Sequence, residues 1–384
     1  MTSNLEPRIA QAISRLPNLD PRLPADSHER GQAATLAERM VHYHVPGVSV
    51  AVVENCELAW ARARGEIRCG SGTPVTPETM FESGSVSKFP VAFAVLRLVE
   101  RGVLNLDRDV NDDLVSWKIP KTKLTATERV TLRRLLTHTS GIPSADQTSW
   151  ALGSTPTLAQ VLAGKRPATN KPVEVHTIPG SEHHYANAGY ILIQQLLEDV
   201  VGRPLDEVMR VEVFEPLGME SSTYAPTNPM WSQSLHAHPH RKDGSAAQSE
   251  LHPSAFAQGG LLTTPTDLAR FAREVMLAAV GRSALLSKDM ARQMLTPQIA
   301  LNPAEYDWAH SQGLGVFLTG PRDDPYFAHP GFSSPGSSAV ILGHPSTGFA
   351  VAMQLNAWGG QHLELELAAS ILAAYDRDIR ELIL

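Results

Sequence analysis

The chain has 384 residues, of which 42% are apolar and 19% are charged. This balance is typical of a globular protein with a sizeable core, which excludes a largely disordered chain, and the length indicates one large domain or two closely joined ones. The formal net charge of −7 offers no basic surface for nucleic acid, and no run of about 18 uncharged apolar residues is present to span a membrane.

The start of the chain shows no sign of a secretory signal. The first twenty residues carry several charged side chains and lack an apolar core. We therefore expect a cytoplasmic protein. Cys56 and Cys69 flank a predicted hairpin, but we expect free thiols, because two cysteines in a reducing compartment are too few for a disulfide scaffold or a cysteine-rich zinc site.

The first elements predicted are an amphipathic helix over residues 27–43 and a hairpin of strands over 47–53 and 58–63. The first strand is rich in β-branched residues, and Glu54 and Asn55 supply a turn. We expect this hairpin to pack beneath the helix that follows Ser85.

Short helical segments dominate the middle of the chain, and strand patterns return near its end. The predicted helices cover 132–136, 157–163, 187–201, 205–214, 265–277 and 288–295, and the late elements are strands over 313–318, 338–342 and 349–355 and a helix over 363–382. This order predicts an α/β (α+β) fold, in which an antiparallel sheet flanked by helices carries an inserted helical domain. Residues 1–80 with 305–384 would form the sheet domain and 81–304 the helical one, with the active site in the cleft between them.

Ser85 and Lys88 lie three residues apart at the start of an apolar helix, on one face of it. Burial lowers the pKa of a lysine and can leave a neutral amine that accepts the serine proton, which makes the hydroxyl a nucleophile. The alternative is a chance Ser-x-x-Lys match, since the pattern alone is weak. Pro90 is also expected to remove the helical hydrogen bond to the Val86 carbonyl and to kink the helix.

Tyr185 and Asn187 form a second candidate group, two residues apart where a helical segment starts. A phenol near a lysine ammonium is expected to have a lowered pKa and to relay protons, and a side-chain amide can hold both the lysine and a substrate carbonyl. The alternative is an asparagine that caps the helix after a half-buried tyrosine.

His329, Gly331 and Phe332 form the third group. The glycine would let substrate approach the backbone, and the N–H groups of Phe332 and Ser85 would make a two-donor oxyanion hole. The alternative is a plain turn with an exposed histidine.

All three groups occur in the order found in the serine beta-lactamase and penicillin-binding-protein family, which the chain resembles over nearly its whole length beyond residue 30. Its branch of class C beta-lactamases, D-alanyl-D-alanine carboxypeptidases, D-aminopeptidases and family VIII carboxylesterases is the most similar. Ser85-Val86-Ser87-Lys88 matches the first motif, Tyr185-Ala186-Asn187 the second, and His329-Pro330-Gly331 stands in place of Lys-Thr-Gly. The segments 135–141, 216–219, 259–261 and 96–102 are similar as well.

The resemblance implies a serine hydrolase without cofactor that works through an acyl-enzyme. Ser85, Lys88 and Tyr185 would be catalytic, and Asn187, His329, Gly331 and Phe332 would bind substrate. Either Lys88 or Tyr185 could take the Ser85 proton. The small-molecule substrate would be an ester or amide, and the oligomeric state stays open.

The third motif departs from the family, because a mostly neutral histidine and a proline replace the cation and hydroxyl that hold a substrate carboxylate. We therefore expect a carboxylesterase for short-chain esters. A beta-lactamase, a D-amino-acid peptidase or amidase, and an acyltransferase are alternatives, and a penicillin-binding sensor module is the non-enzyme alternative.

Other chemistry has weaker support. No Gly-x-Ser-x-Gly elbow in a strand-to-helix context and no His-Glu-x-x-His helix is evident. His236, His238 and His240 resemble a metal-binding cluster, but the charged residues that follow favour an exposed turn, and we expect no metal.

Overall fold

The computed structural model describes residues 5–19, 32–143, 153–224, 236–249 and 254–377. Its centre is an eight-stranded, fully antiparallel sheet in the order β2-β1-β10-β9-β8-β7-β6-β5. The strands are β1 (Gly47–Glu54), β2 (Glu57–Gly65), β5 (Ile299–Ala300), β6 (Ser311–Gln312), β7 (Phe317–Thr319), β8 (Tyr326–Ser333), β9 (Ser337–His344) and β10 (Phe349–Leu355). The predicted α/β class with an antiparallel sheet is confirmed.

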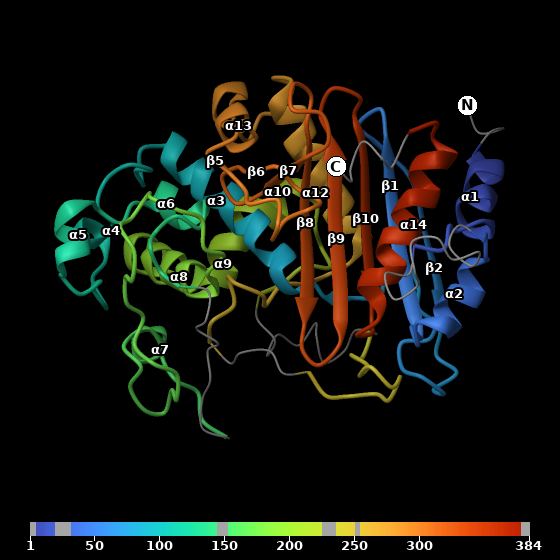
Figure 1. The fold of residues 1–384 in the computed structure, drawn as a ribbon, viewed down its shortest axis with the longest axis horizontal. Helices are drawn as coiled ribbons and strands as arrows, with labels where there is room; N and C mark the ends of the chain where they lie inside the picture. Colours follow the sequence, from blue (N-terminus) through green and yellow to red (C-terminus); the bar gives the residue numbers. More distant parts are fainter. Residues whose placement is uncertain (1–4, 20–31, 144–152, 225–235, 250–253, 378–384) are drawn as a thin grey trace.

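Helices cover both faces of the sheet, and the central strands are therefore continuous apolar runs in the sequence. In β10, Val351 and Met353 point to the face under helix α14 (Gly360–Ala374), and the small Ala350 and Ala352 point to the opposite face. Helices α1 (Leu5–Ser14) and α2 (Leu36–His42) join α14 on the first face, and α12 (Pro265–Ala279) covers the second (Figure 1).

A helical region extends from the second face of the sheet (Figure 1). Its elements are α3 (Lys88–Glu100), α4 (Val110–Asp113), α5 (Lys123–Thr127), α6 (Leu132–Leu136), α7 (Leu158–Leu162), α8 (Asn187–Val201), α9 (Leu205–Met209), a π-helical turn (Arg210–Phe214), α10 (Glu215–Leu217) and α13 (Lys288–Met294). A two-stranded sheet of β3 (Phe81–Glu82) and β4 (Leu262–Thr263) lies at its base. The division into two domains stays a prediction, and α12 lies on the sheet although it falls in the segment assigned to the helical part.

Several predicted elements differ from the structure. The helix expected over 27–43 begins at Leu36 among the described residues, because Thr35 and Glu38 form a capping box there, and the part of that prediction over 27–31 lies outside them. The strand expected over 313–318 is wrong for 313–316, which form the turn between β6 and β7 with Gly315 at φ +77°; only 317 and 318 lie in a strand. The last helix starts at Gly360 and ends at Ala374, and the predicted part over 378–382 lies outside the described residues.

The hairpin of β1 and β2 is confirmed, and its two-residue turn has positive φ at Asn55 and Cys56. It does not pack beneath the Ser85 helix, however, because α12 is the helix that lies against β1. Cys56 is buried, Cys69 is exposed, and both are free thiols, as expected.

No helix in the described part of the chain is long and apolar enough to cross a bilayer.

Candidate active site

Ser85 lies in a single 3-10 turn (Gly84–Ser87) that runs directly into α3. Ser87 ties this turn down: its hydroxyl donates to the Gly84 carbonyl (2.6 Å) and accepts from the Leu261 N–H (2.9 Å). Pro90 falls in the first turn of α3, where a missing N–H leaves no helical bond unmade, and the helix continues without interruption to Glu100. Pro90 therefore does not break the helix.

Lys88 is fully buried at the start of α3, and its ammonium nitrogen lies 2.9 Å from Ser85 Oγ. Burial lowers its pKa well below 10.5, because the surrounding apolar protein solvates the charged form poorly. Nζ also donates to the Gln258 carbonyl. A neutral amine at this distance can accept the Ser85 proton.

Tyr185 reaches the same two groups from far along the chain. The Ser85 hydroxyl lies close enough to its phenol to lower the phenol pKa in part, and Lys88 Nζ lies 5.0 Å from the centre of its ring. We expected a lowered phenol pKa, and this expectation is wrong: burial raises it, and this effect outweighs the lowering that the Ser85 hydroxyl contributes. Tyr185 is therefore a protonated phenol that can donate.

Asn187 is the first residue of α8, and its side chain does not cap the helix. Its Oδ1 is buried and accepts no hydrogen bond from the described residues. The capping alternative therefore fails for this residue, and a free amide oxygen stands two residues after Tyr185.

His329 and Gly331 belong to β8 and not to a turn, so the turn alternative is wrong. Strand β7 pairs with β8 only as far as Ala328, so the edge of β8 beyond that point is free of β7. Pro330 therefore fits in the strand, because its missing N–H removes no bond to β7. The turn around Ser85 lies against this part of β8 instead.

Gly331 and Gly84 bring these two backbones into contact. A Cβ on Gly331 would lie 2.1 Å from the Ser83 carbonyl oxygen and 3.1 Å from the Ser85 nitrogen. A Cβ on Gly84 would lie 2.6 Å from the Phe332 nitrogen. The amides of Ser85 and Phe332 thus belong to two directly abutting segments, the arrangement that a two-donor oxyanion hole requires.

Gly331→Ala is expected to lower kcat/KM by about 100-fold or more, because a shift of about 1 Å at a reacting centre has that effect. Gly189→Ala is the matched control: it lies in α8, where an added Cβ would meet nothing closer than 3.7 Å. Steady-state kinetics and thermal unfolding of both variants make the test. Equal kcat/KM in the two variants would show that β8 does not need this close contact.

His329 is buried and neutral. Its Nδ1 lies 2.8 Å from the Pro330 carbonyl, so Nδ1 carries the proton, and its ring meets that of Phe317 edge to face. Burial and the nearby Lys88 lower its pKa to about 3. The position that carries a lysine in the penicillin-target motif therefore holds no cation at neutral pH.

His138 is a neighbour of the site to which the sequence assigned no role. Its ring packs on Tyr185 (4.3 Å between ring centres), and its Nδ1 accepts from the Ala186 N–H (3.1 Å). Nε2 must then carry the proton, and it has no partner among the described residues. The one signal in the sequence was that His138 lies in the segment 135–141, which resembles the family.

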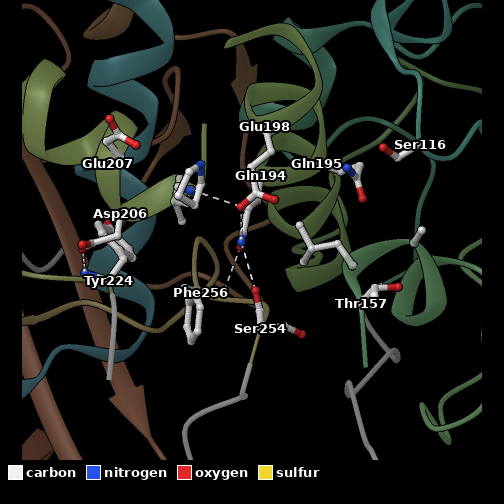
Figure 2. A pocket seen from close by; sticks show the side chains of 14 residues that line it. Ser116, Thr157, Gln194, Gln195, Glu198, Asp206, Glu207, Tyr224, Ser254 and Phe256 are labelled. Carbon is white, nitrogen blue, oxygen red and sulfur yellow. Dashed lines mark hydrogen bonds between the residues drawn. The ribbon is translucent and has the colours of Figure 1, made fainter. Parts of the chain in front are cut away.

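Gln194 of α8 holds the segment that anchors Lys88. Its Oε1 accepts from the N–H groups of Phe256 and Ala257 (2.8 and 3.1 Å), and its Nε2 donates to Ser254 and Glu198. Figure 2 shows the bonds of Gln194 to Glu198 and Ser254 in a cavity of about 750 Å³ beside α8. Gln258, whose carbonyl takes the Lys88 hydrogen bond, follows this segment directly. Ser85 does not line this cavity.

The histidines at 236, 238 and 240 do not form a metal centre. His240 is fully buried, its Nε2 accepts from the Cys69 N–H (3.1 Å) and its Nδ1 lies 2.7 Å from the Asn356 carbonyl, so both ring nitrogens are occupied. In the described ranges no three His, Cys, Asp or Glu side chains are grouped to hold a metal.

The model of the family described as Beta-lactamase matches residues 33–376. The chain belongs to this family. It is a serine hydrolase with the beta-lactamase and transpeptidase fold.

Penicillin-binding protein 4 of Amycolatopsis lactamdurans is 27% identical over 348 residues, which cover 87% of this hydrolase and 86% of that protein. Among solved structures, the octameric penicillin-binding protein homologue from Pyrococcus abyssi has a TM-score of 0.74 at 24% identity, covering 91% of this chain and 77% of that one. The structure of SurE with D-Leu has a TM-score of 0.68 at 27% identity, covering 88% and 73%.

Proposed function

We propose that this serine hydrolase is a carboxylesterase for short-chain acyl esters. The observation that carries the proposal is the neutral His329, whose pKa of about 3 leaves no fixed cation at the third motif to bind a substrate carboxylate. Beta-lactams and D-alanyl peptides carry that carboxylate, and neutral esters do not.

The proposed reaction follows from the protonation states. Neutral Lys88 takes the proton of Ser85 as Oγ attacks the ester carbonyl, and the N–H groups of Ser85 and Phe332 stabilise the oxyanion. The phenol of Tyr185, which is protonated, donates to the leaving alkoxide and receives in turn the proton that Lys88 took from Ser85, and Asn187 orients the substrate. Water then releases the acid from the acyl-enzyme. A small alcohol or amine in place of water would give acyl transfer.

A comparison of kcat/KM for p-nitrophenyl butyrate and nitrocefin tests the substrate class. We expect the ester to be favoured by at least about 100-fold, since a missing charged contact discriminates this strongly. Turnover of nitrocefin alone would overturn the proposal.

Cleavage of D-amino-acid amides is the second candidate. It is supported by the likeness to SurE, whose structure holds D-Leu. D-leucine p-nitroanilide and its L-isomer distinguish this candidate: a strong preference for the D-isomer, with slow ester turnover, would favour the amidase.

The pH dependence should identify the base. We expect kcat/KM to rise with pH through the lowered pKa of Lys88, since only the neutral amine accepts a proton, and to stay level up to about pH 10, because the phenol pKa of Tyr185 is raised. His329→Gln should leave the midpoint of the acid limb unchanged, because His329 is neutral above about pH 4 in the parent protein. A midpoint that moves with this variant would assign the limb to the histidine.

A further inference from the structure

A separate cavity lies on the opposite face of the sheet from Ser85. It has a volume of about 490 Å³, within the ~300–1,000 Å³ typical of small-molecule sites, and lies between α14 and strands β8, β9 and β10. Its walls are mostly apolar and include Trp308, Val340, Leu342 and Met353.

Alternation along β8 separates this cavity from the catalytic groups. Ala328 and Pro330 line the cavity, and the residues between and after them, His329 and Gly331, belong to the face that meets Ser85. A molecule in the cavity would therefore contact the reverse side of the strand that carries the third motif, without entering the active site.

Among the described residues that line this cavity, Glu364 of α14 is the one ionisable residue that is buried. It is 6% exposed, and its Oε1 has no hydrogen-bond partner in the described structure. Burial raises its pKa to about 8, although Ser338 lies close enough to oppose part of the shift. An unsatisfied buried carboxyl oxygen is costly, and a ligand donor would remove that cost.

The charges around the cavity select the ligand. Its charged lining residues in the described chain are Glu364 and the exposed Asp307, and both are acidic. The raised pKa leaves Glu364 largely protonated at neutral pH; an ammonium group beside it would stabilise the ionised form, whereas a carboxylate or phosphate would oppose ionisation.

We propose that this cavity binds a small amphiphilic amine, whose apolar body lies against the sheet and whose ammonium group donates to Glu364. This site is separate from the hydrolytic one and does not depend on which substrate Ser85 attacks.

Titration with n-octylamine, followed by the fluorescence of Trp308, tests the proposal. We expect a saturable change that n-octanoate does not produce at equal concentration, and that disappears in Trp308→Phe. Glu364→Gln should weaken octylamine binding at least tenfold, whereas the exposed Asp307→Asn should change it less than threefold. Equal binding of the amine and the carboxylate, or unchanged affinity in Glu364→Gln, would overturn the proposal.

A second variant distinguishes loss of the binding site from loss of folding. Ala368→Trp fills the mouth of the cavity from the half-exposed side of α14, and it keeps Glu364. It should abolish octylamine binding while its thermal unfolding stays cooperative. Retained affinity in this variant would place octylamine elsewhere on the protein and would refute the assignment.

Discussion

Ser85→Ala is expected to lower kcat for ester hydrolysis by at least about 10⁴-fold, because the acyl-enzyme can no longer form. Its effect on the free energy of unfolding should be small. Ser85 is partly exposed. Of its two neighbours, Lys88 also bonds to the Gln258 carbonyl, and Tyr185 also packs on the His138 ring. Burst kinetics with p-nitrophenyl butyrate and circular dichroism measure the two effects.

Ser87→Ala is the matched control, since Ser87 lies in the same turn but bonds to the backbone. It should reduce stability but keep the nucleophile, so turnover per folded molecule should fall far less than in Ser85→Ala. Mass spectrometry after exposure to a fluorophosphonate should show an adduct on Ser85 in the parent protein and none in Ser85→Ala. Full turnover in Ser85→Ala would remove Ser85 as the nucleophile.

Lys88→Met is expected to lower kcat/KM by about 10²–10⁴-fold, the usual contribution of a general base. Methionine fills much the same space without an amine, so the protein should still fold. Stopped-flow measurement of acylation separates the effect on chemistry from an effect on binding. Acylation at the parental rate would assign the base role to another group.

Lys88→Met should also change how stability depends on pH. In the parent protein the folded pKa of Lys88 lies well below its unfolded value near 10.5, so between these two values the unfolded chain binds more protons. The free energy of unfolding therefore gains a positive slope with pH in that window, and the variant should lack this slope. Denaturant titrations of both proteins across that window give the measurement, with Ser87→Ala as a control that keeps the slope.

The sequence predicted most regular elements because their patterns are local. Helix α8 and strand β10 begin and end where expected, since Asn187–Val201 and Phe349–Leu355 are apolar runs with clear flanks. The π-helical turn after α9 and the break at Gly315 were not foreseen. Gly315 has a positive φ and lies so close to Ala92 that an added Cβ would be 2.2 Å from the Ala92 Cβ. This contact joins parts of the chain that are distant in sequence, so the local pattern does not show it.

The candidate site was predicted in its residues but not in its surroundings. Ser85, Lys88 and Tyr185 come together as the spacing and the resemblance suggested, and their catalytic roles stay a proposal. Strand β8 was not predicted, because Pro and Gly at 330 and 331 break strands in most contexts, and the free edge that tolerates them is a tertiary property. The Gln258 carbonyl and the His138 ring were missed for the same reason.

The placement of β8 late in the sequence has a consequence for synthesis on the ribosome. The Ser333 hydroxyl donates to the Glu82 carboxylate, and the two residues are 251 positions apart in the sequence. The segment before Ser85 therefore lacks this packing partner until β8 leaves the exit tunnel. At about 5–20 residues per second, this interval lasts from roughly ten seconds to about a minute. A nascent chain therefore carries the Ser85 hydroxyl well before the strand that lies against it has been synthesised.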